Sequence, residues 1–167
     1  ISPDEIIFDY GQNGKPELVN SSVAGKIKFN LSHSKEYAVL ALTHTDEIGV
    51  DIELIKSIPE MFDIAQELYT ENENDILKNS SDESKNIFFR FWTRKEAIIK
   101  AVGKGLSAPL KMIDVSSDNS IVIDRLFENH SKEFEGCRLI DLTPPAGYKA
   151  AVAVFGNIKE ISYFTVQ

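Results

Sequence analysis

The sequence predicts an α+β fold, and three observations support this prediction. Strand-like alternation dominates the chain up to about residue 53, helical periodicity runs from 59 to 102, and strand patterns return after Pro109. Strands and helices that occupy separate runs, instead of alternating one by one, are typical of α+β proteins. The chain has 167 residues, enough for one domain or for two small lobes.

Composition limits the classes of partner. The formal net charge is −8, which argues against a nucleic-acid backbone or an anionic membrane as the main partner. No apolar run approaches the roughly 18 residues of a membrane span, and no signal peptide is visible. The single cysteine, Cys137, excludes a disulfide framework and favours a reducing compartment, so we expect a cytoplasmic protein. Because Cys137 lies in an apolar stretch, we interpret it as a structural thiol.

Three strands are predicted in the first third of the chain, and the last two of them are antiparallel. Residues 1–9 alternate weakly and predict a strand, and residues 10–16 are a loop by composition, with Lys15 as a candidate anion contact. Residues 27–31 alternate like a half-buried strand, and residues 37–43 are nearly all apolar, like a buried one. These two strands predict a hairpin.

The predicted hairpin carries polar residues at its tip. We place Ser32 and His33 in the turn between the two strands. A histidine at a hairpin tip is, on its own, more often a surface residue than a ligand.

A fourth predicted strand carries two acidic residues. In residues 48–53 the apolar side chains point one way, and Gly49, Asp51 and Glu53 point the other way. Carboxylates two residues apart on one strand face lie about 7 Å from each other, and Gly49 leaves room for a ligand. The pattern fits a metal or catalytic site, and it also fits a solvent-facing side of a strand or a strand that simply ends in two acids.

The central helices follow from capping and periodicity. Pro59 favours the start of a helix over residues 59–69, and Thr70 with Glu73 forms a capping-box pattern for a short helix to about Lys78. A long helix over residues 83–102 carries four aromatic residues, which we interpret as core: Phe88, Phe89, Phe91 and Trp92.

The end of the long helix combines apolar and charged residues in an unusual way. Lys95 lies in the middle of the apolar arc, so its ammonium needs a partner or a route to water. Glu96 and Lys100 are four residues apart and share a helix face, where the simplest interpretation is a surface ion pair. Gly103 and Gly105 end the helix.

The last third of the chain predicts further antiparallel strands. Residues 112–116 and 121–124 flank a turn, residues 134–142 form another strand, and residues 148–155 and 160–166 form a last hairpin.

Three groups of residues, each a weak signal alone, have one common explanation: Ser32 and His33 with Lys15, the Asp51 and Glu53 strand, and the Glu96 and Lys100 helix face. Asp51, Glu53 and Glu96 supply carboxylates, which are hard oxygen ligands suited to Mg²⁺. Lys15 and Lys100 supply cations suited to phosphate. Together these groups point to transfer at a phosphate, with charge neutralisation and positioning as the main contributions.

The order of these motifs resembles the 4′-phosphopantetheinyl transferase family, and more narrowly its surfactin-synthetase-activating (Sfp-like) type. The resemblance covers residues 10 to 110 through motifs and the last third through its strand pattern. The residues that carry it are Gly14-Lys15-Pro16, Phe29-Asn30-Leu31-Ser32-His33-Ser34, Ile48-Gly49-Val50-Asp51-Ile52-Glu53, Trp92-Thr93-Arg94-Lys95-Glu96 with Lys100, and Gly103-Lys104-Gly105-Leu106.

The resemblance implies an activity and its partners. It implies an enzyme that moves 4′-phosphopantetheine from coenzyme A, its co-substrate, to a serine hydroxyl of an apo acyl or peptidyl carrier protein. Adenosine 3′,5′-bisphosphate is the other product, Mg²⁺ is the cofactor, and the enzyme is a monomer with no nucleic-acid or membrane partner.

The resemblance also implies a fold of two similar α+β lobes related by a pseudo-twofold. We expect a lobe at residues 1–46 and a second at residues 47–167. The first lobe is much the shorter and lacks a segment that members of this type carry before the Gly-Lys-Pro loop. Because the chain begins with Ile1, we expect either a piece of a longer protein or a reduced member.

The family's functional positions transfer to this sequence residue by residue. Asp51, Glu53 and Glu96 match the family's metal-binding carboxylates. Glu96 also matches the residue that is proposed as the base in the family. Lys100 matches the lysine that contacts the leaving phosphate. These two are the predicted catalytic residues. The predicted coenzyme-binding residues are Gly14, Lys15, Pro16, Ser32, His33, Asp51, Lys95 and Lys100.

Two alternatives remain at this stage. Within the family, the small trimeric holo-acyl-carrier-protein synthase type is disfavoured, because Ser32 and His33 precede the metal strand in the same chain. Outside catalysis, the chain could be a coenzyme- or carrier-binding remnant of such an enzyme. The candidate docking residues for a carrier are Arg94, Lys104 and Leu106.

Overall fold

The predicted α+β class is confirmed by a computed structural model. The model describes residues 2–11, 14–19, 26–103, 110–117, 121–123, 136–156 and 160–165. The helices are α1 (Met61–Leu68), α2 (Glu71–Lys78) and α3 (Ser84–Val102), with short 3₁₀ turns η1 (Pro3–Glu5), η2 (Ser81–Glu83) and η4 (Leu110–Met112). The strands are β1 (Phe8–Tyr10), β2 (Pro16–Leu18), β3 (Lys28–Ser34), β4 (Tyr37–Thr43), β5 (Glu47–Leu54), β6 (Ile121–Ile123), β7 (Cys137–Asp141) and β8 (Tyr148–Phe155).

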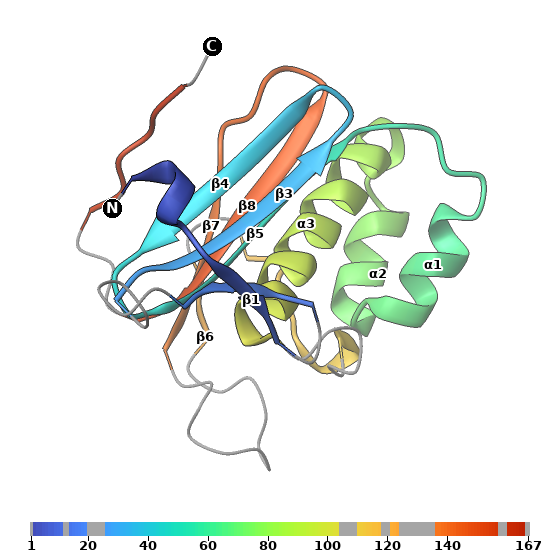
Figure 1. The fold of residues 1–167 in the computed structure, drawn as a ribbon. Coiled ribbons are helices and arrows are strands. Elements are labelled where there is room, and N and C mark those ends of the chain that lie inside the picture. The colour runs from blue at the N-terminus through green and yellow to red at the C-terminus, as the bar shows by residue number, and fades with distance from the viewer. Residues whose placement is uncertain are drawn as a thin grey trace.

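The strands form three antiparallel sheets. Two are two-stranded, β1–β2 and β3–β4, and the third has the order β5-β8-β7-β6. Helix α3 packs against β5 and β8 on one face of the large sheet, with α1 and α2 on the far side of α3 (Figure 1). In this order the acidic strand β5 lies at one edge of the large sheet, where it pairs with β8 and Asp51 lies opposite Ala151.

Both faces of the large sheet are covered. On one face, the aromatic side chains of α3 pack with α1, α2 and the sheet residues Leu139, Ala151 and Ala153. On the other face, a smaller cluster joins β5 and β8 to Val39 and Ala41 of β4. The interpretation of the α3 aromatic residues as core is therefore confirmed, with Phe88, Phe89 and Phe91 buried and Trp92 partly buried.

The helices follow the predicted local signals. Thr70 accepts a hydrogen bond from the backbone N–H of Glu73, and the Glu73 carboxylate accepts one from the N–H of Thr70, which completes the predicted capping box. Gly103 ends α3 with φ of 69°, in the left-handed region that glycine adopts without strain. Gly105 lies outside the described residues.

Gly49 brings β5 and α3 into direct backbone contact. An added Cβ at this position would overlap the backbone of Ala97 and Ala101 in α3. The space at Gly49 therefore accommodates the helix, and the expectation that it accommodates a ligand was wrong. This close approach places the Lys100 side chain of α3 beside the acidic residues of β5.

A Gly49→Ala variant is expected to lose about 3 kcal/mol of unfolding free energy, because overpacking against a rigid backbone forces α3 away from the sheet. Gly11→Ala is the matched control: its Cβ would lie 3.8 Å from the nearest carbonyl oxygen, at ordinary contact distance. Urea denaturation measures both. Equal stability of the two variants would contradict the tight packing of β5 on α3.

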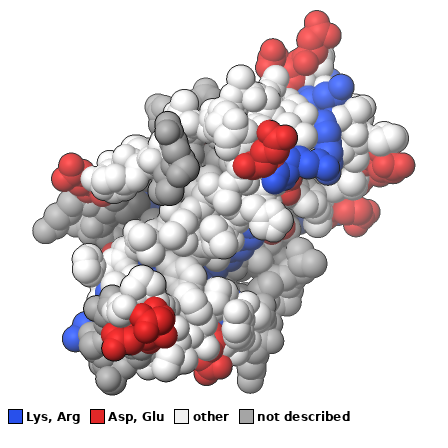
Figure 2. All heavy atoms as spheres, turned by 45° about the horizontal axis from the view of Figure 1, so that its top comes forward, with Lys and Arg blue, Asp and Glu red and all other residues white. Residues whose placement is uncertain are grey.

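The hairpin of β3 and β4 exists but differs from the prediction in two ways. Ser32 and His33 lie within β3, and the turn is formed by Lys35 and Glu36. The β4 strand is covered on one face only; Leu40 and Leu42 on its outer face are 56% and 62% exposed. The face shown in Figure 2 has a wide uncharged area, with both acidic and basic side chains visible around it.

Two predicted C-terminal strands are absent from the described residues. Residues 112–116 form the end of η4 and an irregular segment, and β6 pairs with β7 instead. Residues 160–165 are not a strand; β8 already pairs with β5 on one side and β7 on the other, so it has no free edge for a hairpin partner. The predicted turn at residues 118–120 lies outside the described residues.

Lys95 finds its partner in the core. Its ammonium lies 2.9 Å from the Glu73 carboxylate and donates to the carbonyl oxygens of Leu110 at 2.8 Å and Ile113 at 2.7 Å. Glu73 is fully buried and also accepts from the N–H of Val115. Burial lowers the pKa of Lys95, and the Glu73 charge opposes this shift. The buried ion pair therefore ties α2 and α3 to the segment after η4.

Arg94 is also internal, which removes it as a docking residue. It is fully buried and donates from Nε and Nη2 to the two carboxylate oxygens of Asp141, at 2.6 and 2.7 Å. Burial raises the pKa of Asp141, but the hydrogen bonds and charges of Arg94 and Arg90 outweigh it, and the net shift is downward. The other two predicted docking residues, Lys104 and Leu106, lie outside the described residues.

Two composition-based expectations can be compared with the structure. Cys137 is buried in the core, and burial raises the pKa of its thiol to about 12, as expected of a structural cysteine. Among the described helices, none combines the length and apolar character that a membrane span requires.

Candidate active site

The site begins where β3, β5 and α3 meet. The Lys100 ammonium of α3 donates to Asp51 Oδ1 of β5 at 2.6 Å and to Ser32 Oγ of β3 at 3.0 Å. The Ser32 hydroxyl in turn donates to Asp51 Oδ1 at 2.9 Å. Lys100 thus pairs with Asp51, and the simpler prediction of a surface ion pair between Lys100 and Glu96 is wrong.

Asp51 is a buried carboxylate with one oxygen unused. The side chain is 5% exposed, and Oδ2 has no hydrogen-bond partner within the described part of the chain. Burial raises the pKa of Asp51; the charge and hydrogen bond of Lys100 lower it, and the net shift is upward. A buried oxygen without a donor is costly, so this atom is available to a ligand.

Glu96 is a second carboxylate in the same electrostatic field. Its pKa is raised by burial first and then by the negative charge of Asp51, with Lys100 opposing the shift. Within the described ranges, Glu96 forms no hydrogen bond or ion pair. Its partly buried carboxylate is therefore free to bind a cation or accept a proton.

Glu53 completes the acidic group. Its charge raises the pKa of both Asp51 and Glu96, so the three carboxylates repel one another. The Ser34 hydroxyl donates to Glu53 Oε2 at 3.0 Å. Strand β5 therefore presents Asp51 and Glu53 on the face predicted from the sequence.

The donor set fits a divalent cation, although it is not closed around one. Among the described residues, no three His, Cys, Asp or Glu side chains lie close enough together to hold a metal ion as they stand. Asp51 Oδ2 lacks a partner, and the mutual repulsion of the three carboxylates would be relieved by a bound cation. Carboxylate oxygens are the ligands that Mg²⁺ prefers.

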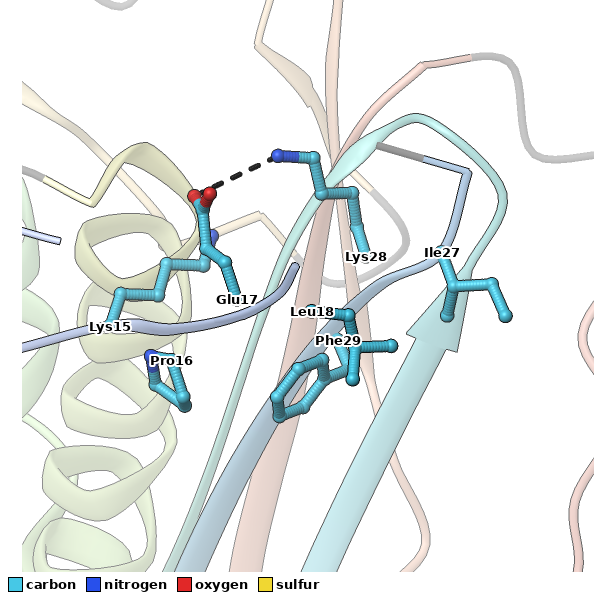
Figure 3. A pocket seen from close by; sticks show the side chains of 7 residues that line it. All are labelled: Lys15, Pro16, Glu17, Leu18, Ile27, Lys28 and Phe29. Atoms are coloured by element: carbon cyan, nitrogen blue, oxygen red, sulfur yellow. Dashed lines mark ion pairs between the residues drawn. The ribbon is translucent and has the colours of Figure 1, made fainter. Parts of the chain in front are cut away.

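A loop between β1 and β2 reaches the same end of α3. The Lys15 ammonium donates to Glu47 at 2.9 Å and to the carbonyl oxygen of Ala101 at 3.2 Å. Gly14 precedes it with φ of 76°. Together with β2 and the start of β3, Lys15 lines a pocket, drawn in Figure 3, whose other lining residues are Pro16, Glu17, Leu18, Ile27, Lys28 and Phe29.

Some predicted coenzyme contacts do not join this group. His33 is exposed on the outer face of β3, because neighbouring residues of a strand point to opposite faces. Lys95 is 2% exposed and its ammonium pairs with Glu73 in the core, so the structure does not bring it together with Asp51 and Lys100. Gly14 is exposed and does not line the pocket.

Sequence reasoning missed several residues that contact the site. Ser34 binds Glu53, Asn30 binds the backbone of β5, and Glu47 pairs with Lys15. The alternation of Asn30, Ser32 and Ser34 along one strand was a visible signal, since polar residues at period two share one face.

Comparisons with known proteins found one matching family model and several related proteins. The family model "4'-phosphopantetheinyl transferase superfamily" matches residues 47–153, more than half of the chain. The 4'-phosphopantetheinyl transferase HetI of Nostoc sp. is 33% identical over 157 residues, which cover 93% of this chain and 63% of HetI. The transferase ffp of Bacillus subtilis is 36% identical, covering 86% of this chain and 59% of ffp. Sfp of Bacillus subtilis strain 168 is 33% identical, covering 91% and 64%.

These matches confirm the resemblance drawn from the motifs, including its Sfp-like character. The chain spans 59 to 64% of the length of these three relatives. The matched residues 47–153 include Asp51, Glu53, Glu96 and Lys100. This chain belongs to the 4′-phosphopantetheinyl transferase superfamily.

Proposed function

We propose that this protein transfers 4′-phosphopantetheine from coenzyme A to a serine hydroxyl of an apo carrier protein. The reaction forms a bond between the serine oxygen and the phosphorus next to pantetheine, and it breaks that phosphorus's bond to the leaving adenosine 3′,5′-bisphosphate. The observation that carries the proposal is the meeting of Asp51, Glu96 and Lys100 at the contact of β5 with α3, in a chain of this superfamily.

Asp51, Glu53 and Glu96 are the residues that would hold Mg²⁺. When bound, the ion would neutralise charge on the coenzyme pyrophosphate. We propose that Lys100 donates to the leaving phosphate, since its side chain is 29% exposed and its ammonium is oriented by Asp51 and Ser32. A lysine fixed in this way needs little reorganisation when charge develops on the leaving group.

Glu96 is the proposed acceptor of the serine proton, directly or through a water molecule. Its raised pKa supports this role, because a more basic carboxylate removes a proton more readily. A bound cation would lower the pKa of Glu96. If Glu96 both binds the cation and accepts the proton, its basicity is therefore limited.

The pocket beside Lys15 and Pro16 is the proposed seat of the adenine nucleotide. The Lys15 ammonium donates to the carbonyl oxygen of Ala101, the residue that follows Lys100 in α3, so we propose that the two cations serve different phosphates of one ligand. Glu47 holds Lys15 in this position.

We propose a lobe boundary between residues 46 and 47, with the two small sheets before it and the large sheet after it, which is supported by the sheet topology. We further propose a monomeric cytoplasmic enzyme that acts on acyl or peptidyl carrier proteins.

Mass spectrometry of an apo carrier protein tests the proposed activity. The carrier is incubated with the chain, coenzyme A and Mg²⁺, and a mass gain of one phosphopantetheine is expected. A carrier that binds the chain without gaining mass would favour the alternative, a non-catalytic binding remnant. Carriers from fatty-acid and peptide synthesis, tested side by side, define the substrate class.

A further inference from the structure

On the outer edge of β5, backbone N–H groups donate hydrogen bonds to side chains of β3 instead of to the backbone of a neighbouring strand. On its inner edge β5 pairs with β8, while β3 runs along the other edge and belongs to a separate sheet (Figure 1). The N–H of Val50 donates to Asn30 Oδ1 at 2.8 Å, and the N–H of Leu54 donates to Ser34 Oγ at 3.1 Å. Between them, the N–H of Ile52 lies 3.4 Å from Ser32 Oγ.

These contacts form a regular series. Positions 30, 32 and 34 of β3 meet positions 50, 52 and 54 of β5, so the two strands run in the same direction in a single register. Side chains at period two share one strand face. A slip of one residue would replace the polar groups with Leu31 and His33, which now lie on the exposed face.

Each serine of the series also holds a carboxylate. Ser32 donates to Asp51 at 2.9 Å, and Ser34 donates to Glu53 at 3.0 Å. A hydroxyl has one proton to donate and two lone pairs to accept with. Accepting the N–H of β5 therefore leaves its proton for the carboxylate one residue earlier on the same strand.

We propose that Asn30, Ser32 and Ser34 form a side-chain ladder that fixes Asp51 and Glu53 for cation binding, which makes Asn30 and Ser34 positioning residues. This inference rests on the proposed function, because it assigns the ladder a role at the proposed cation site. Groups that orient metal-binding side chains by hydrogen bonds strongly affect metal affinity when they are removed. The ladder also couples the register of β3 to the acidic strand.

The test compares variants at Ser34, using Mn²⁺ as a spectroscopic probe for the divalent cation. Ser34→Ala removes both hydrogen bonds, and we expect about tenfold weaker Mn²⁺ binding, measured by electron paramagnetic resonance of the free ion. Ser34→Thr keeps the hydroxyl and suits a strand, so near-wild-type affinity is expected. In the transfer assay, Ser34→Ala should lower kcat and leave the KM for coenzyme A unchanged.

Controls separate positioning from folding. Leu31→Thr changes the same strand on its exposed face and should leave Mn²⁺ affinity unchanged. If Ser34→Ala fails to fold, Ser34→Cys replaces it; its thiol is a weak donor, and an affinity between those of wild type and the expected Ser34→Ala value supports the ladder. Wild-type Mn²⁺ affinity in Ser34→Ala, or in Ser34→Cys where it replaces Ser34→Ala, would overturn the inference even if the variant unfolds more easily.

The design also distinguishes this inference from the proposed function. A wild-type chain that transfers phosphopantetheine and binds Mn²⁺, with Ser34→Ala unchanged in both, overturns the ladder alone. A wild-type chain that neither binds Mn²⁺ nor labels a carrier overturns the proposed function, and the ladder's role falls with it.

Discussion

A Glu96→Gln variant is expected to label an apo carrier at least about 100-fold more slowly than the wild-type chain. Glutamine keeps the size of the side chain but can neither accept the serine proton nor offer a charged oxygen to a cation. The measurement is the initial rate of carrier labelling with coenzyme A and Mg²⁺ in excess. Near-wild-type labelling would remove Glu96 from its proposed catalytic role.

The same variant is expected to be more stable at pH 8. Burial raises the pKa of Glu96 above its value in the unfolded chain, followed by repulsion from Asp51 and Glu53. A raised pKa in the folded state means that stability is highest below the unfolded pKa and is lost as pH rises through the folded pKa. The neutral amide avoids that loss, so the gain should be present at pH 8 and absent near pH 4.

Urea denaturation at the two pH values measures this gain, and Glu67→Gln provides the control. Glu67 is exposed on α1, so its amide variant should match wild type in both labelling and stability. A Glu96→Gln variant that loses stability at both pH values would indicate a structural carboxylate instead of one held at a cost for function.

Lys95→Met is expected to cost the fold about 4 kcal/mol, because breaking a buried ion pair leaves an unpaired charge in the core. The Glu73 carboxylate would lose the ammonium at 2.9 Å, and the carbonyl oxygens of Leu110 and Ile113 would lose their donor. A loss of this size is a large fraction of the stability of a typical domain. The midpoint of urea unfolding should fall accordingly.

A double variant isolates the ion pair from the rest of the change. Adding Glu73→Gln to Lys95→Met removes the unpaired charge and should recover part of the lost stability. Lys85→Met, at an exposed position of the same helix, should change stability by less than about 0.5 kcal/mol. If Lys95→Met behaved like Lys85→Met, the buried pair would not contribute to the fold.

The helices were predictable because their signals are local. The capping box at Thr70 and Glu73 and the glycine cap at Gly103 act within a few residues, so sequence spacing determines them. The two C-terminal strands failed for the opposite reason. Alternation indicates that a segment can be a strand, but strand pairing depends on which sheet edges are free.

The charged residues of the candidate site could be predicted from the sequence, but the side chains that contact them could not. Asp51, Glu53 and Lys100 were found because charges on a strand or helix face are visible as patterns. The distinction between Lys95 and Lys100 was not visible, because it depends on the buried Glu73, which lies 22 residues earlier in the chain. Ser34 and Asn30 were missed because their partners lie on β5, across two sheets.

Titration of Mn²⁺ into the wild-type chain, followed by calorimetry, tests most directly whether carboxylates from β5 and α3 act on one cation. We expect one ion per chain, with affinity at least about tenfold lower in both Asp51→Asn and Glu96→Gln. Weaker Mn²⁺ binding in both variants is the result expected if β5 and α3 contribute to one cation site. Wild-type affinity in either variant, or no binding to the wild-type chain, would contradict the proposed cation site.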